Sequence, residues 1–306
     1  MKLLLTGASG FIGHNVLLRA PRDWEIVAVY HRTPGLEDFV KAQGLSNVRP
    51  FRCDLLNEDE VKSLARAIGG RPDAMLYLAA NGDPAASAER PRWDLESNTV
   101  ALVTCLEQCP ADHVVYVSSG AVYDGLLGSV SPASAVSPRL PYAISKLASE
   151  QYLRFFAEQR GSVGSYINVR FFGAYGPYEP ARKITTRWLL AMAAGQREFV
   201  IRGDGQNLID FMYVDDAVDG FLALVRAKGT HATVDFASGA PVSVNQAVRT
   251  MAATLGVAVV LRHEGTVAEY IEFRSVDSTM RDRFGMKPAR SFEDGLRELQ
   301  GFLGRA

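Results

Sequence analysis

Residues 1–16 read MKLLLTGASGFIGHNV, and this stretch decides the fold. An apolar leucine run is followed by Gly7, Gly10 and Gly13 in the spacing G-x-x-G-x-x-G. Glycines at this spacing allow a tight turn, let the backbone approach a pyrophosphate, and let the next helix pack on the strand. The free N–H groups at the start of that helix then face the phosphates. We therefore predict a strand, a glycine turn and a helix that bind a dinucleotide; a tight turn that binds nothing is the alternative.

Short apolar runs alternate with helical patterns beyond this stretch. The runs include WEIVAVY, AMLYLAA, HVVYVSS and SYINVRF, and EDEVKSLARAI and YAISKLASEQYLRFFAEQ read as helices between them. Runs of Val, Ile, Leu and Tyr without polar alternation are typical of strands that are covered on both faces. The alternation predicts an α/β fold with a doubly wound, parallel Rossmann sheet.

The pattern changes near Pro177, which predicts two lobes. We expect a dinucleotide-binding domain over residues 1–176 and a smaller substrate-binding lobe over residues 177–306. The two are interleaved, because part of residues 210–240, including the strand TVDFAS at 233–238, returns to the main sheet. The cleft between such lobes is a usual place for a ligand.

Composition limits the partners that we expect. The chain has 306 residues and a net charge of −1, which gives no general attraction to nucleic acid or to an anionic membrane. The leucine run is far too short for a membrane span or a signal peptide. Three cysteines form no disulfide framework, which fits the cytoplasm. Cys105 and Cys109 lack further ligands nearby, so we expect buried thiols and no metal site.

The end of the second predicted strand bears on the choice of cofactor. An acid there accepts hydrogen bonds from the ribose hydroxyls, whereas an arginine accommodates a 2′-phosphate. Residues 30–32 contain no acid and include Arg32, so we predict NAD(P) binding with NADP slightly favoured over NAD. A solvated loop arginine is the alternative. Further residues follow the third and fourth strands, where an adenine and its ribose would lie: Asp54, Leu55, Leu78, Ala79 and Ala80.

Three polar residues form a candidate catalytic group. Ser119 ends the fifth predicted strand, and PYAISK places Tyr142 and Lys146 on one face of a helix. A free tyrosine has a pKa of about 10, and a nearby ammonium lowers it by roughly one to three units. Tyr142 would then exchange a proton with a hydroxyl or carbonyl oxygen that Ser119 also hydrogen-bonds, and Lys146 would also hold the nicotinamide ribose. A Tyr/Lys pair that merely covers the helix surface is the alternative.

The motifs together resemble the extended short-chain dehydrogenases/reductases, specifically the nucleotide-sugar epimerase/dehydratase family. The resemblance covers nearly the whole chain through TGASGFIG, CDL, LAA, SNTVAL, VSSGAVYDG, PYAISK, VRFFGAYGP, GDGQNLIDFMYVDDAV and SGAPVSVNQ. It implies a catalytic triad of Ser119, Tyr142 and Lys146. It also implies these cofactor-site residues: Gly7, Gly10, Phe11, Ile12 and Gly13 at the pyrophosphate, Asp54 and Leu55 at the adenine, Phe171 near the nicotinamide, and Asn98, which steadies the active-site strand and helix.

The chain departs from the family pattern in its substrate site. Gly120 and Ala121 stand where dehydratases carry an Asp-Glu pair, so a 4,6-dehydratase is not expected. Gly173 replaces an asparagine, and Ile209 replaces an arginine that binds the substrate diphosphate. Charged hydrogen bonds are worth roughly 1.5–3 kcal/mol each, so either another cation substitutes or the substrate differs. The candidate cations are Arg182, Lys183, Arg187, Arg262 and Arg274. We predict this substrate site: Ser119, Gly173, Arg182, Asn207 and Arg274.

The resemblance implies an NAD(P)-dependent nucleotide-sugar epimerase that acts at C4 through a transient keto-sugar. An NADPH-dependent 4-keto-sugar nucleotide reductase needs the same triad and is the alternative, which Arg32 favours. A non-catalytic dinucleotide sensor is a third possibility, but such a protein has little reason to keep the triad in register. The apolar faces of residues 98–109 and 148–159 predict a homodimer, with packing inside the core as the alternative.

Overall fold

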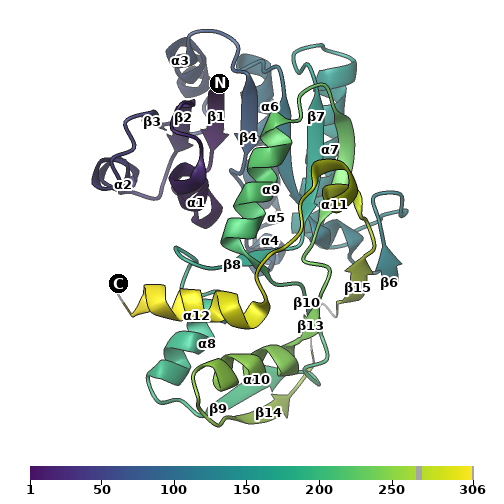
Figure 1. Cartoon of the computed structure of the whole chain (residues 1–306). Helices are drawn as coiled ribbons and strands as arrows, with labels where there is room; N and C mark the ends of the chain where they lie inside the picture. Colours follow the sequence, from purple (N-terminus) through teal and green to yellow (C-terminus); the bar gives the residue numbers. More distant parts are fainter. Residues whose placement is uncertain (267–270, 305–306) are drawn as a thin grey trace.

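The computed structural model describes residues 1–266 and 271–304 (Figure 1). Seven parallel strands form the main sheet, and helices cover both of its faces, so the predicted doubly wound α/β fold is confirmed. The strand order is β12 (His231–Phe236), β7 (Tyr166–Phe171), β5 (Val114–Ser119), β4 (Ala74–Tyr77), β1 (Lys2–Thr6), β2 (Glu25–Tyr30) and β3 (Val48–Arg52).

The glycine turn joins β1 to α1 (Phe11–Arg19). Gly7 has a φ of +70°, and a Cβ there would lie 2.9 Å from the Ala79 backbone nitrogen. A Cβ on Gly13 would meet the carbonyl oxygens of Gly7 and Ala8. Both positions therefore require glycine, because the turn lies against the end of β4 and α1 packs directly on the turn.

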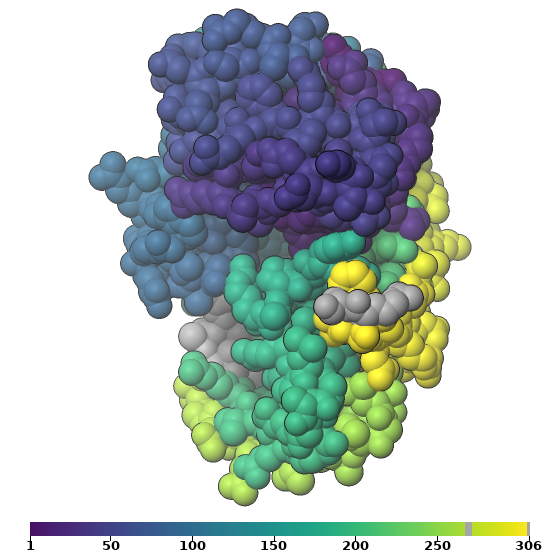
Figure 2. Space-filling view, turned by 90° about the vertical axis from the view of Figure 1, so that its left-hand side faces the viewer, coloured from purple at the N-terminus to yellow at the C-terminus, as the bar shows by residue number. Residues whose placement is uncertain are grey.

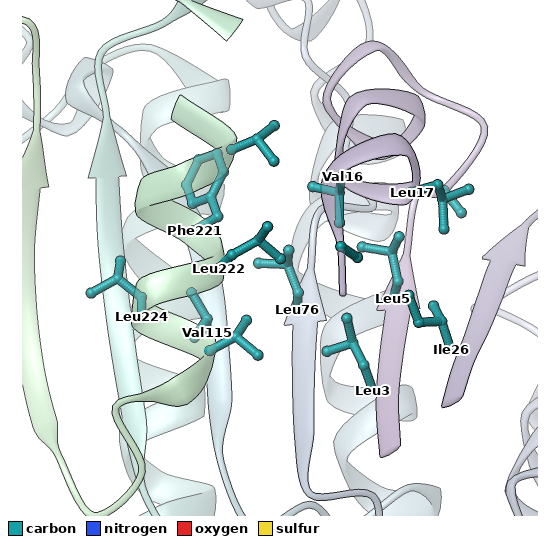
Figure 3. Close-up of a cluster of buried hydrophobic side chains, with 14 of the residues drawn as sticks. Leu3, Leu5, Val16, Leu17, Ile26, Leu76, Val115, Phe221, Leu222 and Leu224 are labelled. Atoms are coloured by element: carbon teal, nitrogen blue, oxygen red, sulfur yellow. The ribbon is translucent and has the colours of Figure 1, made fainter. Parts of the chain in front are cut away.

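Alternate side chains of the strands build two apolar layers. Leu3 and Leu5 lie in the layer under α1 and α9 (Val214–Arg226), where Phe221 also packs (Figure 3). Leu4 lies in the opposite layer, under α3 (Glu58–Ile68), α6 (Ala101–Gln108) and α7 (Pro141–Glu158). Burial on both faces explains why the strands lack polar alternation.

The lower part of Figure 1 holds a second cluster of elements with its own core. It consists of α8 (Ile184–Ala193), α10 (Val244–Thr254), α12 (Phe292–Leu303), and the parallel pair β9 (Glu198–Arg202) and β14 (Val260–Glu264). The strand near residues 233–238 lies in the main sheet as β12. A further return was not predicted: α11 (Thr279–Phe284) packs Met280 into the core of the main sheet. The division into two domains at residue 176 stays a prediction.

Short elements complete the fold. The helical ones are α2 (Leu36–Ala42), α4 (Pro84–Glu89), α5 (Pro91–Leu95), a π-helical segment (Glu96–Val100) and a 3₁₀ turn (Gly120–Tyr123). The strands pair as β6 (Leu127–Val130) with β15 (Glu272–Ser275), β8 (Ala174–Tyr175) with β11 (Met212–Tyr213), and β10 (Leu208–Ile209) with β13 (Val242–Ser243). In the described part of the chain, no helix has the length and apolar character to cross a membrane.

Candidate active site

Two adjoining cavities lie beyond the carboxyl ends of the parallel strands, with volumes of about 400 Å³ and 500 Å³. Their shared wall includes Gly7 and Gly10 from the turn and Leu78, Ala80, Asn81 and Gly82 from the segment after β4. The carboxyl ends of strands are where open α/β sheets bind ligands.

The cavities bring together the predicted cofactor residues, with one exception. The first cavity is lined by Gly7, Gly10, Arg32, Asp54, Leu55, Leu78, Ala79 and Ala80. The second cavity adds Phe11, Ile12, Gly13, Tyr142, Lys146 and Phe171. Asn98 is the exception, since it lines neither cavity.

The start of α1 fits the pyrophosphate of a dinucleotide. Gly10 precedes the helix in an extended conformation, no side chain caps this end, and the first turn contains no acid. No side chain therefore accepts a hydrogen bond from the first N–H groups of the helix, such as those of Phe11 and Ile12. Both residues lie on the cavity wall. Such a terminus favours a phosphate.

The adenosine side of the first cavity combines one carboxylate with an exposed arginine. Asp54 accepts a hydrogen bond from Leu56 N at 3.1 Å, and its Oδ1 lies 3.7 Å from His31 Nδ1. Arg32 is exposed, lines the same wall and forms no ion pair within the described residues. An arginine in this position could face a 2′-phosphate.

Ser119 and Tyr142 meet on the wall of the second cavity. Ser119 is the last residue of β5, and its Oγ accepts a hydrogen bond from Ala121 N at 3.1 Å. The Ser119 side chain also lies beside the Tyr142 phenol, close enough to lower the pKa of that phenol. Pro141 begins α7, so Tyr142 lies in the first turn, where Ser87 Oγ accepts its backbone N–H at 3.1 Å.

Burial controls the protonation of Tyr142 and Lys146. Burial raises the pKa of Tyr142, and the neighbouring Ser119 side chain opposes this shift. Burial lowers the pKa of Lys146 to about 7, against the carboxylates of Glu150 and Asp94. The predicted net lowering of the Tyr142 pKa is wrong in this structure, because desolvation is the larger effect and the net shift is upward. The Lys146 amine instead donates to the Val117 carbonyl at 2.5 Å.

Asn98 has a positioning role rather than the predicted place at the cofactor. Its Nδ2 donates to Asp94 Oδ1 and to Ser145 Oγ, both at 2.9 Å. Its Oδ1 accepts the Asn81 N–H at 2.7 Å. Because its side-chain polar atoms are all used, Asn98 ties the segment after β4 to α7 and offers nothing to a cofactor.

The predicted substrate residues divide between the two cavities. Ser119, Gly173, Asn207 and Arg274 line the second cavity, beside Ile209. Arg182 instead lines the first cavity, so its assignment to the substrate site is corrected. Neighbouring residues on a loop can face different cavities, and the sequence pattern does not show which cavity each side chain faces.

The other candidate cations are also separated. Lys183 lines the second cavity. Arg187 lines neither, and Arg262 is paired with Glu198 at 2.6 Å. Lys183 and Arg274 are therefore the cations available to a substrate, since the amine of Lys146 faces a backbone carbonyl.

A buried ion pair lies behind the second cavity and was missed from the sequence. Arg170 on β7 and Glu150 on α7 pair at 2.9 Å, with their side chains 6% and 2% exposed. Ser118 Oγ donates to Glu150 Oε1 at 2.6 Å. Glu150 follows Lys146 by one helical turn, and this spacing was the signal available in the sequence.

The network continues from Arg170 to the C-terminal part of the chain. Arg170 donates to the Tyr123 hydroxyl at 3.1 Å, and Tyr123 donates to Asp235 Oδ1 at 2.7 Å. Ser275 donates to Asp235 Oδ2 at 2.7 Å. Ser275 follows Arg274 on β15, so the network connects both walls of the second cavity.

The residues that the structure describes contain no His, Cys, Asp or Glu cluster able to hold a metal. Cys53, Cys105 and Cys109 are buried and form no disulfide.

Comparison with known proteins gives the family. A Bacillus subtilis protein described as an uncharacterized UDP-glucose epimerase is 27% identical over 99% of this chain and 98% of its own. A dTDP-4-dehydro-6-deoxy-D-allose reductase from Streptomyces bikiniensis is 30% identical over 83% of this chain and 81% of its own. The solved structure of MoeE5 in complex with UDP-glucose and NAD is 26% identical, with a TM-score of 0.85 over 100% of this chain and 99% of MoeE5. The model of the NAD-dependent epimerase/dehydratase family matches residues 3–235, so this chain belongs to that family of enzymes.

Proposed function

We propose that this chain is a nucleotide-sugar 4-epimerase that uses a bound NAD(P) and passes through a transient keto-sugar. The observation that carries the proposal is that Ser119 and Tyr142 meet on a cavity wall that also includes the glycine turn and Phe171. Gly120 and Ala121 provide no acid or base for eliminating water, which argues against a dehydratase.

The proposed mechanism needs one base and one oxygen-binding group. When bound, the nicotinamide would take up a hydride from the sugar carbon and later return it. Tyr142 takes the hydroxyl proton as the carbonyl forms, and Ser119 holds the same oxygen in place. The charged form of Lys146 stabilises the phenolate. After the keto-sugar turns over, Tyr142 returns the proton to the same oxygen.

The available cations support a nucleotide-sugar as the substrate. Lys183 and Arg274 line the second cavity, and either can replace the arginine that Ile209 lacks. Cations of this kind bind the diphosphate that links a nucleoside to its sugar. The UDP-glucose epimerase relative and MoeE5 bound to UDP-glucose favour UDP as the first nucleotide to test.

A net reductase is the second candidate. The Streptomyces relative is named as a reductase of a keto-sugar linked to dTDP, and Arg32 suits the 2′-phosphate of NADPH. We propose a modest preference for NADP on this basis, although the family is named for NAD and MoeE5 contains NAD. Titration of both cofactors tests the preference: Arg32→Ala should weaken NADP and leave NAD unchanged, and equal NADP affinity in the variant overturns it.

Analysis of the cofactor that copurifies, combined with two turnover assays, separates the candidates. An epimerase should retain an oxidised cofactor, convert UDP-glucose to UDP-galactose and consume no reductant. A reductase should be purified without cofactor and consume NADPH with a dTDP-linked 4-keto-sugar. Tyr142→Phe should reduce the rate of either reaction by roughly 10²–10⁴-fold while cofactor binding persists. Unchanged turnover in that variant would exclude the proposed base.

A further inference from the structure

A short loop before α8 carries two adjacent cations that lie in different cavities. Arg182 lines the first cavity, together with Ser9 and Gly10 of the glycine turn. Lys183 lines the second cavity, together with Tyr142. Both cations are exposed, and within residues 1–266 and 271–304 neither side chain forms a hydrogen bond or an ion pair.

The loop is held at both ends. Asn15 on α1 donates from Nδ2 to the Pro177 carbonyl at 2.9 Å, which ties the loop to the helix that follows the glycine turn. The Glu179 carboxylate accepts the Thr186 hydroxyl at 2.6 Å, which ties it to the first turn of α8. In Figure 2 the teal chain of this region adjoins the purple N-terminal part of the molecule. The backbone that carries the two cations is therefore held close to both cavities.

The charges of the two side chains act on each other. Much of the Lys183 side chain is exposed, but the protein atoms around its ammonium lower its pKa by desolvation. The charge of Arg182 lowers this pKa further, and Glu179 and Asp83 oppose the shift. An anion beside each cation offsets this repulsion, because opposite charges attract at short range. The loop therefore suits one phosphate-bearing ligand in each cavity.

We propose that Arg182 binds the phosphates of the dinucleotide and Lys183 those of the nucleotide-sugar, so that two neighbouring residues of one loop serve two different ligands. The assignment of Arg182 follows from the glycine turn in its cavity. The assignment of Lys183 rests on the proposed function, which supplies the nucleotide-sugar.

Binding titrations test both assignments without turnover. The probes are UDP and NADH (or NADPH, if the wild-type chain binds it more tightly), each titrated alone. Arg182→Gln should weaken the binding of the reduced cofactor roughly tenfold and leave the binding of UDP within twofold of the wild type. Lys183→Gln should do the reverse. Arg187→Gln is the matched control, because Arg187 is exposed on α8 and lines neither cavity.

Several results would overturn the inference. One is that Arg182→Gln binds the cofactor as tightly as the wild type does. Another is that Arg182→Gln and Lys183→Gln weaken the binding of the same ligand equally. A third is that the Arg187→Gln control weakens binding as much as either variant. If the wild type epimerises UDP-glucose while Lys183→Gln binds UDP normally, the inference fails and the proposed function stands. If the wild type binds neither UDP nor dTDP, the proposed function and the Lys183 assignment fail together, while the cofactor titration still decides Arg182.

Discussion

Lys146 shows how one buried side chain links the fold to the chemistry. It lies on α7 one turn after Tyr142, in an environment that lowers its pKa to about 7. Its charged form, which the phenolate of Tyr142 needs, therefore dominates below that pH and is lost above it. Side-chain spacing alone predicts the pair, but the sign of the Tyr142 shift depends on burial, which the spacing does not report.

The first prediction concerns the pH dependence of kcat/KM, which reports groups of the free enzyme. We expect kcat/KM to fall above about pH 7, as Lys146 loses its proton. Lys146→Arg keeps a positive charge throughout this range, so the fall should disappear even if the maximum rate is lower. Steady-state kinetics from pH 6 to 9 on both proteins provide the measurement. A fall at the same pH in the arginine variant would assign it to another group.

Asp235 gives a second prediction, on stability. Burial raises its pKa to about 6, so the folded state favours the protonated carboxyl more than the unfolded state does. Its stabilising effect is fully present below about pH 4 and is lost as the pH rises through 6. Asp235→Asn should therefore raise the free energy of unfolding at pH 8, by up to about 3 kcal/mol, with little difference near pH 4. Urea denaturation at several pH values measures this.

A control with the opposite sign is available in Asp73. The hydrogen bond from Lys228 lowers the pKa of Asp73, so its charged form stabilises the folded state above about pH 4. Asp73→Asn should destabilise the protein at neutral pH, and the difference should vanish as the pH falls. If the change in the free energy of unfolding had the same pH dependence in both variants, the opposite pKa shifts expected for Asp235 and Asp73 would be wrong.

At the scale of elements, two glycines within helices have opposite consequences. Gly13 in α1 leaves no room for a Cβ, because the carbonyl oxygens of Gly7 and Ala8 occupy that space. Gly301 in α12 is exposed, and a Cβ there would meet nothing within 4 Å. Gly13→Ala should therefore destabilise the protein by about 1–3 kcal/mol, whereas Gly301→Ala should stabilise it by up to about 1 kcal/mol. Urea unfolding of both variants measures these changes. The prediction fails if Gly13→Ala leaves the free energy of unfolding unchanged.

The sequence predicts features that depend on local spacing, but not features that depend on contacts between distant segments. The strand, glycine turn and helix at residues 1–19 follow from local spacing, and so does the serine at the end of β5. The cavity that Arg182 lines and the saturated side chain of Asn98 depend on contacts between distant segments. Periodicity carries no information about such contacts. The return of α11 to the main sheet was missed for the same reason, because its short apolar pattern fits either core.

At the scale of the whole molecule, the chain crosses between its two cores several times. After α8 and β9, α9 and β12 rejoin the main sheet, and α11 does so again before α12. These crossings place the second cavity between residues far apart in the sequence, such as Ser119 and Arg274. The cleft is therefore formed by the complete chain rather than by either core alone.

The outer face of α7 bears on association. Ile144, Tyr152 and Phe155 are 47%, 46% and 44% exposed, and their spacing of eight and three residues places them on one side of the helix. Val100, from the neighbouring π-helical segment, is also exposed. Large apolar side chains gathered on one surface commonly mark an interface. We therefore keep the prediction of a homodimer, with a second copy of this chain as the partner on this face.

Sedimentation of charged variants tests the dimer. Tyr152→Glu combined with Phe155→Glu would bury two carboxylates in the proposed interface, which is unfavourable without partners, so the dimer should dissociate to monomers at micromolar concentration. Leu127→Glu is the control. Leu127 is 71% exposed, and it lies on β6, a strand that pairs with β15 and is not part of the α7 face. It should leave the sedimentation coefficient unchanged. A wild-type chain that remains monomeric across the concentration range would show that these side chains face solvent, and a control that dissociates equally would show that added charge, not the α7 face, is responsible.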